Sequence, residues 1–350
     1  MGSGPIPIAI DADIARARPP GAGFYLDDAS FAAVRERVFA RSWQWIGDLA
    51  AVREPGALAP RTLLSGLLDE PLLLARDAQG ALRCLANVCT HRGHLLVGAP
   101  CRGREIRCPY HGRRFDLDGR ARFMPGFDGV ADFPLPQDHL PELAFGSFGG
   151  HGFASLDPAV PLDELLEPVR RHLPGLALEG FVHDASRDRD FEFDAHWALY
   201  VENYLEGLHI PFVHPGLAKA LDWGRYRYEL HAHGNLQLGI DEAGAIAAHY
   251  FWLFPNLMLN FYPWGLSLNQ VLPLAPSRTR VIFRAYVARP ELLERGAGAA
   301  LGTVELEDEA AVQSVQRGIR SRRFGGGGRY APAHERGVHQ FHRLLARHLG

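Results

Sequence analysis

The sequence has no long apolar run and no excess of charge of either sign. Among 350 residues there are 37 basic and 40 acidic side chains, which gives a net charge of -3 at pH 7. This balance offers no electrostatic reason to bind nucleic acid or an anionic membrane surface. No stretch approaches the roughly 18–20 apolar residues that span a bilayer, and no signal peptide pattern opens the chain. We therefore expect a cytoplasmic globular protein that binds neither nucleic acid nor membrane.

Cysteine is scarce too. There are only 4, Cys84, Cys89, Cys101 and Cys108, and all fall in one short segment. A disulfide framework would spread its bridges across the chain and is typical of small secreted domains. Four thiols crowded into one segment of a chain without a predicted signal peptide indicate metal binding instead.

The length suggests two domains, at about 100–200 residues each. Apolar spacing predicts a helix over 30–45 that starts at Ser30. Between about 55 and 150, short apolar runs alternate with turn residues, which is typical of antiparallel β structure. Further on, the patterns predict strands at 191–194 and near 225–240, 247–262 and 279–288, and helices at 195–209, 303–320 and 334–348.

The first motif lies in the cysteine segment. Residues 89–91 read Cys-Thr-His and residues 108–111 read Cys-Pro-Tyr-His. Two cysteines on one iron and two histidines on the other are the ligands of a Rieske [2Fe-2S] cluster. Structural zinc takes the same ligands, but its usual motifs pair like with like, whereas each loop here mixes the two types. The pattern favours a cluster held by Cys89, His91, Cys108 and His111, with zinc as the alternative; Cys84 and Cys101 are expected to be buried structural thiols.

Residues 87–93 (Asn-Val-Cys-Thr-His-Arg-Gly), 108–112 and 115–119 (Phe-Asp-Leu-Asp-Gly) resemble the Rieske domain of Rieske non-haem iron oxygenases. One departure is Arg113, because a tryptophan commonly follows the His-Gly pair. The ligands are intact, but the departure leaves open how the cluster edge meets a partner.

The second motif covers residues 203–214, Asn-Tyr-Leu-Glu-Gly-Leu-His-Ile-Pro-Phe-Val-His. On a helix, Asn203, Glu206 and His209 would follow one side, and a break at Pro211 could bring His214 back beside His209. Two histidines need one carboxylate to make a facial triad with positions open for dioxygen on Fe(II), and Asp308 is the best candidate. Taken alone, the pair is weak evidence for a metal, and two structural histidines are the simpler explanation.

Downstream of the first motif, the pattern Asn-x2-Glu-x2-His-x4-His resembles the mononuclear iron motif of the same oxygenase family. The resemblance implies an α+β protein: a helical segment at 1–40 packing on the catalytic domain, an antiparallel β Rieske domain at 41–155, and a helix-grip catalytic domain at 156–350. It further implies Fe(II) ligands and catalytic residues, namely His209, His214 and Asp308 on iron, with Asn203 and Glu206 beside them. Glu206 would be the bridging carboxylate that links His111 of one subunit to His209 of the next, and the protein a homotrimer.

Glu206 also indicates a subgroup, because the family usually has aspartate there. Glutamate is found in relatives that act on quaternary ammonium compounds, and the segments 307–308, 315–318, 328–330 and 339–345 resemble choline monooxygenase relatives. The resemblance implies hydroxylation or oxidative demethylation of a small quaternary ammonium or N-methylated substrate with O2. Aromatic-ring hydroxylation, by a monooxygenase or a dioxygenase, is the alternative; a Rieske electron-transfer protein with a hydrophobic-ligand-binding domain is the non-enzyme alternative.

Three further features concern the substrate pocket, the electron donor and the surface around the cluster. The aromatic residues Trp252, Tyr262 and Trp264 could form a cation–π pocket or simply core. No flavin or plant-type ferredoxin pattern appears, so electrons from NAD(P)H should arrive through a separate ferredoxin and/or flavin reductase. Eight arginines crowd the cluster region against three acidic residues and could form a docking face or a solvated surface: Arg92, Arg102, Arg104, Arg107, Arg113, Arg114, Arg120 and Arg122.

Overall fold

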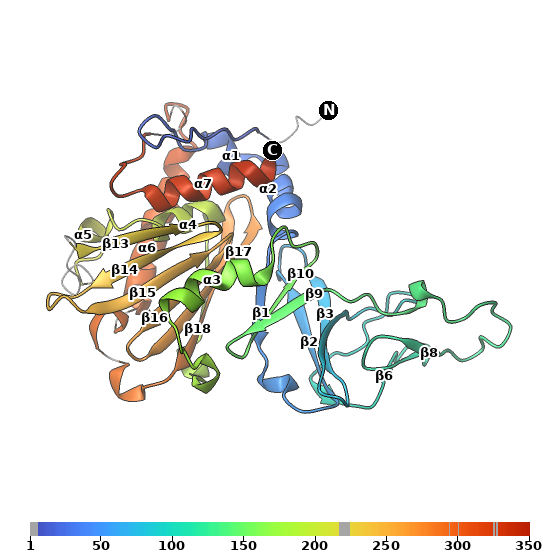
Figure 1. Ribbon diagram of the computed structural model, residues 1–350. Coiled ribbons are helices and arrows are strands. Elements are labelled where there is room, and N and C mark those ends of the chain that lie inside the picture. The colour runs from blue at the N-terminus through green and yellow to red at the C-terminus, as the bar shows by residue number, and fades with distance from the viewer. Residues whose placement is uncertain (1–5, 217–224, 294, 300, 325, 327) are drawn as a thin grey trace. The chain divides into compact units, whose positions relative to one another are not determined.

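The computed structural model describes residues 6–216, 225–293, 295–299, 301–324, 326 and 328–350 (Figure 1). The chain forms two compact units, one of residues 40–159 and one that joins residues 1–39 to residues 160–350. Within the described ranges, no helix is both long and apolar enough to cross a membrane.

The 40–159 unit is built from short antiparallel strands, as the sequence predicts. One sheet has the order β1-β10-β9, a second β4-β3-β2-β5 and a third β6-β7-β8. Their bounds are β1 Gln44–Asp48, β2 Ala57–Leu63, β3 Glu70–Arg76, β4 Leu82–Ala86, β5 Cys101–Arg102, β6 Ile106–Arg107, β7 Arg114–Phe115, β8 Ala121–Phe123, β9 Ala144–Phe148 and β10 His151–Ser155.

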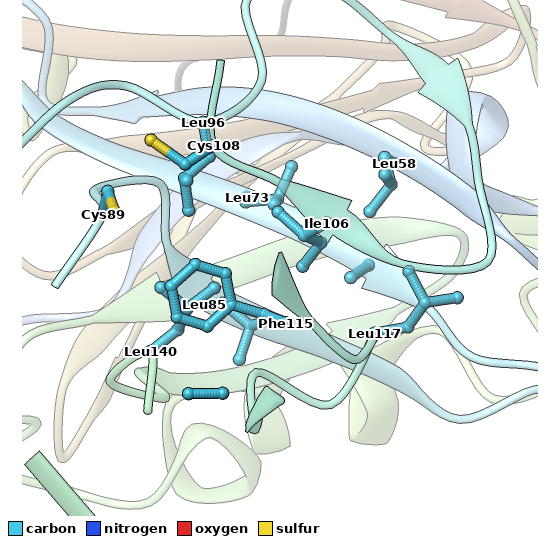
Figure 2. Packing of buried hydrophobic residues seen from close by; sticks show 12 residues of the cluster. Leu58, Leu73, Leu85, Cys89, Leu96, Ile106, Cys108, Phe115, Leu117 and Leu140 are labelled. Carbon is cyan, nitrogen blue, oxygen red and sulfur yellow. The ribbon is translucent and has the colours of Figure 1, made fainter. Parts of the chain in front are cut away.

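The core of this unit includes the two thiols of the first motif. Leu73, Leu85 and Phe115 belong to one buried cluster with Cys89 and Cys108. Figure 2 shows both cysteines at one end of that cluster, with the apolar side chains beyond them. The loops that carry the thiols are therefore fixed by the burial of their own cysteines.

The larger unit contains one antiparallel sheet in the order β11-β18-β17-β16-β15-β14-β13, with β12 also paired to β18. The bounds are β11 Val182–His183, β12 Arg189–Phe193, β13 Arg227–His231, β14 Gly234–Ile240, β15 Ile246–Leu253, β16 Leu257–Tyr262, β17 Gly265–Ala275 and β18 Arg278–Val287. The long strand β17 is absent from the sequence-based prediction. Antiparallel sheet and long helix together confirm the predicted α+β class.

Helices pack on this sheet, and the helix α4 contacts β17, α6 and α7. The bounds are α1 Ala22–Leu26, α2 Asp28–Val34, α3 Leu162–His172, α4 Trp197–Tyr204, α5 Ile210–Val213, α6 Leu301–Ile319 and α7 Arg336–Leu349. The predictions for 303–320 and 334–348 are confirmed to within two residues at each end.

The predicted helix at 30–45 is wrong at both ends. It begins at Asp28, because the side chain of Asp27 accepts the Ser30 N–H at 2.7 Å and caps it. A π-helical turn follows and ends at Phe39. Residues 40–43 form a turn, and β1 begins at Gln44, which pairs with Ala154 of β10. Strand pairing outweighs the helical spacing of the apolar residues there.

His196, just before α4, makes the larger unit sensitive to acid. Its ring packs edge-on against Phe24 at 5.2 Å, and its Nδ1 accepts the Ala198 N–H at 3.3 Å. Complete burial lowers the pKa of His196 from 6.5 to about 3. Since only the unfolded chain takes up this proton between those values, stability is full above pH 6.5 and falls as the pH drops toward 3, by up to about 1.4 kcal/mol per pH unit.

We expect His196→Gln to flatten this loss between pH 6.5 and 4.5, measured as the free energy of urea unfolding against pH. His334→Gln, at an exposed position, is the matched control and should leave the slope unchanged. An equal slope in the wild type and the His196 variant would contradict the prediction.

Candidate metal centres and active site

The two loops of the first motif have the same backbone geometry. The Gly93 N–H donates to the Cys89 carbonyl at 2.9 Å, and the Gly112 N–H donates to the Cys108 carbonyl at 3.0 Å. Both glycines have positive φ, 71° and 72°, a conformation that a side chain would strain. The different spacings, CxH and CxxH, thus belong to two equivalent turns that each present a thiol and an imidazole.

The four side chains of this motif converge. The Cys89 and Cys108 side chains are buried together, and the rings of His91 and His111 lie 4.9 Å apart, edge to face. The Nδ1 of His91 is buried and has no hydrogen-bond partner in the described part of the chain. The motif offers two thiols and two imidazoles, and one of these imidazoles has a ring nitrogen without a partner. This set fits a [2Fe-2S] cluster with two cysteine and two histidine ligands. The other two cysteines differ: Cys84 is buried as expected, but Cys101 is exposed, so its predicted burial is wrong.

The second motif also assembles a metal-binding group. One donor atom each from His209, His214 and Asp308 lies within 4.8 Å of the others. The His214 Nε2 is 2.9 Å from the Asp308 Oδ1, and the His209 Nε2 is 3.6 Å from the same oxygen. Asn203 donates its side-chain N–H to that oxygen as well. Two imidazoles and one carboxylate on one side of a site match the facial triad of non-haem Fe(II).

Helix geometry produces this group differently from the sequence-based prediction. The helix α4 ends at Tyr204, two residues before Glu206, and α5 begins at Ile210. The break therefore precedes Pro211. Glu206 stabilises the turn between α4 and α5, because its Oε2 accepts hydrogen bonds from the backbone N–H groups of Leu208 and His209. His214 is nevertheless beside His209, with the rings 5.1 Å apart, as the prediction required.

Each histidine of the group is oriented by a glutamate. The Glu206 Oε1 lies 2.7 Å from the His209 Nδ1, and the Glu307 Oε2 lies 2.7 Å from the His214 Nδ1. A carboxylate on Nδ1 fixes the tautomer and leaves Nε2 free to bind a metal. Sequence reasoning missed the part played by Glu307; its only signal is an acidic residue directly before Asp308.

One other trio among the described residues meets the same distance criterion, His172, Glu229 and His231. Its centre already holds a cation, because the Arg171 guanidinium lies 3.0 Å from the His231 Nδ1 and 3.5 Å from the His172 Nε2. A metal ion there would have to displace the arginine. The group formed by His209, His214 and Asp308 is the better metal site.

A cavity of about 820 Å³, including its open mouth, adjoins His209, His214 and Asp308. Gln237, Tyr250, Asn260 and Ser267 are paired directly across β14, β15, β16 and β17 and form one row of its wall. Five tyrosines contribute to the lining: Tyr200, Tyr204, Tyr226, Tyr250 and Tyr262. No lysine or arginine occurs among the described lining residues. The wall is thus aromatic and amide-rich.

The structure separates the three aromatic residues predicted for a pocket. Tyr262 lines the cavity. Trp252 does not, because it is fully buried and donates its indole N–H to the Pro255 carbonyl at 3.2 Å. Trp264 borders a different cavity, with Arg284. Neither tryptophan lines this cavity. Trp252 faces the same side of β15 as Tyr250 but packs on Phe341 of α7 at 5.4 Å, and Trp264 lies in the turn between β16 and β17.

Glu305 was also missed as a lining residue. It is 4% exposed and accepts the Tyr200 hydroxyl at 2.7 Å, while its second oxygen has no partner among the described residues. Burial raises the pKa of Glu305 well above the ordinary value. One oxygen of this buried carboxyl group is therefore left without a partner at the cavity, within the described part of the chain.

Two family models match the chain, the Rieske [2Fe-2S] domain over residues 42–134 and the ring hydroxylating alpha subunit (catalytic domain) over residues 229–350. The chain belongs to the Rieske non-haem iron oxygenases and is a catalytic subunit of that family. Its cofactors are accordingly a Rieske cluster and a mononuclear iron, and a separate reductase supplies the electrons.

Among its relatives is the carnitine monooxygenase oxygenase subunit of Escherichia coli (strain K12), 29% identical over 93% of this chain and 92% of the relative. The chloroplastic choline monooxygenase of Arabidopsis thaliana is 29% identical over 95% of this chain and 83% of the relative. The quaternary ammonium Rieske monooxygenase CntA in complex with gamma-butyrobetaine has a TM-score of 0.78 and 25% identity, covering 99% of this chain and 100% of that one.

Proposed function

We propose that this chain oxidises a quaternary ammonium or N-methylated compound at a carbon bonded to nitrogen. The observation that carries the proposal is the tyrosine-lined cavity beside the His209, His214 and Asp308 group. Aromatic faces attract quaternary ammonium groups through cation–π interactions. The names of the carnitine and choline monooxygenase relatives support the same substrate class.

In this proposal the 40–159 unit is the cluster domain, and Cys89, His91, Cys108 and His111 hold the [2Fe-2S] cluster. The larger unit is the catalytic domain. The boundaries predicted from sequence, after residues 40 and 155, lie one and four residues from those of the compact units. Cytoplasmic location remains a prediction from sequence.

His209, His214 and Asp308 would hold the mononuclear Fe(II), which binds and activates dioxygen. Glu206 and Glu307 bond the Nδ1 atoms of the two imidazoles and so aim their Nε2 atoms at the metal position. Asn203 steadies Asp308 through its hydrogen bond. The tyrosines orient the ammonium group, and their buried phenols stay protonated because burial raises the pKa of Tyr204, Tyr226 and Tyr262 well above 10.0.

The overall reaction balances as one monooxygenation. Substrate C–H, O2, two electrons and two protons give C–OH and water. When the hydroxylated carbon is an N-methyl group, its C–N bond breaks to release formaldehyde, the demethylated amine and, from a quaternary ammonium, one proton. The reductase supplies the electrons.

We further propose a homotrimer in which Glu206 links His209 to His111 of the neighbouring subunit. The support is the 2.7 Å contact that Glu206 already makes with the His209 Nδ1. The structure of a quaternary ammonium Rieske monooxygenase that is 25% identical to this chain is described as giving insights into inter-subunit electron transfer, which supports this arrangement. Measuring the solution mass of the purified protein tests the trimer.

A single-turnover assay tests the function. Chemically reduced protein with both metals bound is mixed with O2 and a panel of N-methylated amines and arenes, and products are read by mass spectrometry. We expect an oxygenated or demethylated amine. A hydroxylated arene with unchanged amines would replace the proposed substrate class by the aromatic-ring alternative.

Tyr262 offers a sharper test of the cation–π interaction. We expect Tyr262→Leu to raise KM for a quaternary ammonium substrate about 3- to 30-fold, the equivalent of one lost cation–π contact. Tyr262→Phe keeps the aromatic face and should stay near the wild type. Binding of the neutral tert-butyl analogue should respond equally to both variants; if the leucine variant weakens the analogue as much as the ammonium, shape rather than charge explains the effect.

A further inference from the structure

Arg113, two residues after His111, is a buried cation beside the cluster ligands. It is 2% exposed, whereas six of the eight arginines of this region are exposed and Arg114 is half-buried. Its guanidinium carbon lies 5.6 Å from the ring centroid of Phe115 and 5.2 Å from that of Phe133. Arg113 is therefore no part of the surface that a reductase would meet.

Asp138 accepts hydrogen bonds from this guanidinium and from the other ligand loop, and so connects the two loops. The Asp138 Oδ1 accepts from Arg113 at 2.6 Å, and the backbone carbonyl of Asp138 accepts from it at 3.2 Å. The same carbonyl accepts the Thr90 hydroxyl, from the first ligand loop, at 2.7 Å. Backbone pairing adds a further tie, since the Cys108 N–H donates to the Arg113 carbonyl at 2.8 Å.

The negative charge of Asp138 does not fully cancel the positive charge of Arg113. Asp138 has 22% of its side chain exposed against 2% for Arg113, so water screens the carboxylate more than the guanidinium. Arg113 also lies close to the ligands, because it is two residues from His111 and its backbone carbonyl is bonded to the Cys108 N–H.

We propose that Arg113 is a positioning and tuning residue that raises the reduction potential of the cluster by holding a permanent, buried positive charge against both ligand loops. Reduction adds one negative charge to the cluster, and a nearby unscreened cation stabilises the reduced form more than the oxidised form. Arginine suits this place because its guanidinium stays charged when buried and can bond two acceptors of Asp138 at once.

The test is a redox titration of the cluster in the complete, metal-loaded chain, followed by visible absorbance and by the EPR signal of the reduced cluster. We expect Arg113→Gln to lower the equilibrium constant for reduction about tenfold, which is 59 mV for a one-electron couple. Arg113→Lys should retain at least half of the wild-type effect. Arg114→Gln is the matched control, with the same change of charge at the next residue, and should not shift the potential.

Asp138→Asn separates charge from structure. It breaks the same ion pair as Arg113→Gln but removes the negative partner, so we expect the potential to rise. A structural role alone would move both variants in the same direction, and that result, or an unshifted potential in Arg113→Gln, would overturn the proposal. If Arg113→Gln does not bind a cluster, two other measurements still distinguish an effect of charge from a structural role. They are the direction in which Asp138→Asn shifts the reduction potential and the potential of Arg113→Lys.

Discussion

Glu206→Gln is expected to retain both metals and to lose about 10- to 100-fold in product formation. The carboxylate accepts from the His209 Nδ1 at 2.7 Å and from two backbone N–H groups of the turn that carries this histidine. Glutamine keeps the length and one acceptor oxygen, but loses the charge that makes such a bond strong. Losses of this size are typical when a group that orients a metal ligand is changed.

Three measurements identify the cause of that loss. Iron content and cluster absorbance report whether the metals stay bound, and the rate of cluster reoxidation with substrate and O2 reports electron transfer. In the proposed bridging role, reoxidation slows together with product formation. Glu206→Asp, which keeps the charge and shortens the side chain, should fall between the wild type and the glutamine variant. Unchanged turnover in Glu206→Gln would remove the bridging role, and loss of iron alone would reduce Glu206 to a residue that orients His209.

The residues that sequence predicts best here are those whose partners lie nearby in the chain. Cys89 with His91, and Cys108 with His111, each sit in one tight turn, so spacing alone indicates the ligand set. His209 and His214 are likewise neighbours. In each case a turn of a few residues is sufficient to bring the side chains together.

Residue spacing could not predict the site residues whose partners are distant in the sequence. Asp308 lies on α6, far along the chain from His214, and no periodicity connects them. The sequence offered it only as the best candidate carboxylate, and the family resemblance then implied its role. Glu307 and Glu305 could not be separated from the other acidic residues of that helix. The structure distinguishes them, because α6 packs on α4 and turns these side chains toward the His214 ring and the Tyr200 hydroxyl.

The strand β17 shows why the cavity itself was not predicted. Its alternation places Ser267 and Asn269 on the cavity side and Leu266 and Leu268 on the other, yet all four are buried. A polar row on a strand usually marks the solvent face. Here it marks the lining of an internal site, which only the paired neighbours across the sheet can show.

Asp308→Ala is expected to abolish iron binding, whereas Glu307→Gln weakens it about 10- to 100-fold. Among the described residues, Asp308 is one of three side chains whose donor atoms meet at the proposed metal position, and its loss leaves two imidazoles. Glu307 bonds the His214 Nδ1 at 2.7 Å and acts only through that ring. The [2Fe-2S] cluster should remain in both variants, because its ligands belong to the other unit of the chain.

Glu309→Gln is the matched control for both substitutions, since this residue is on the same helix, α6, and next to Asp308. Burial raises the pKa of Glu309, and glutamine keeps the length of this side chain while removing its charge. Iron affinity, measured by titrating Fe(II) into the metal-free protein without oxygen, should equal that of the wild type. A Glu307 variant that also binds iron like the wild type would show that His214 needs no carboxylate to orient it. An Asp308 variant with full iron content would place the third ligand elsewhere in the chain.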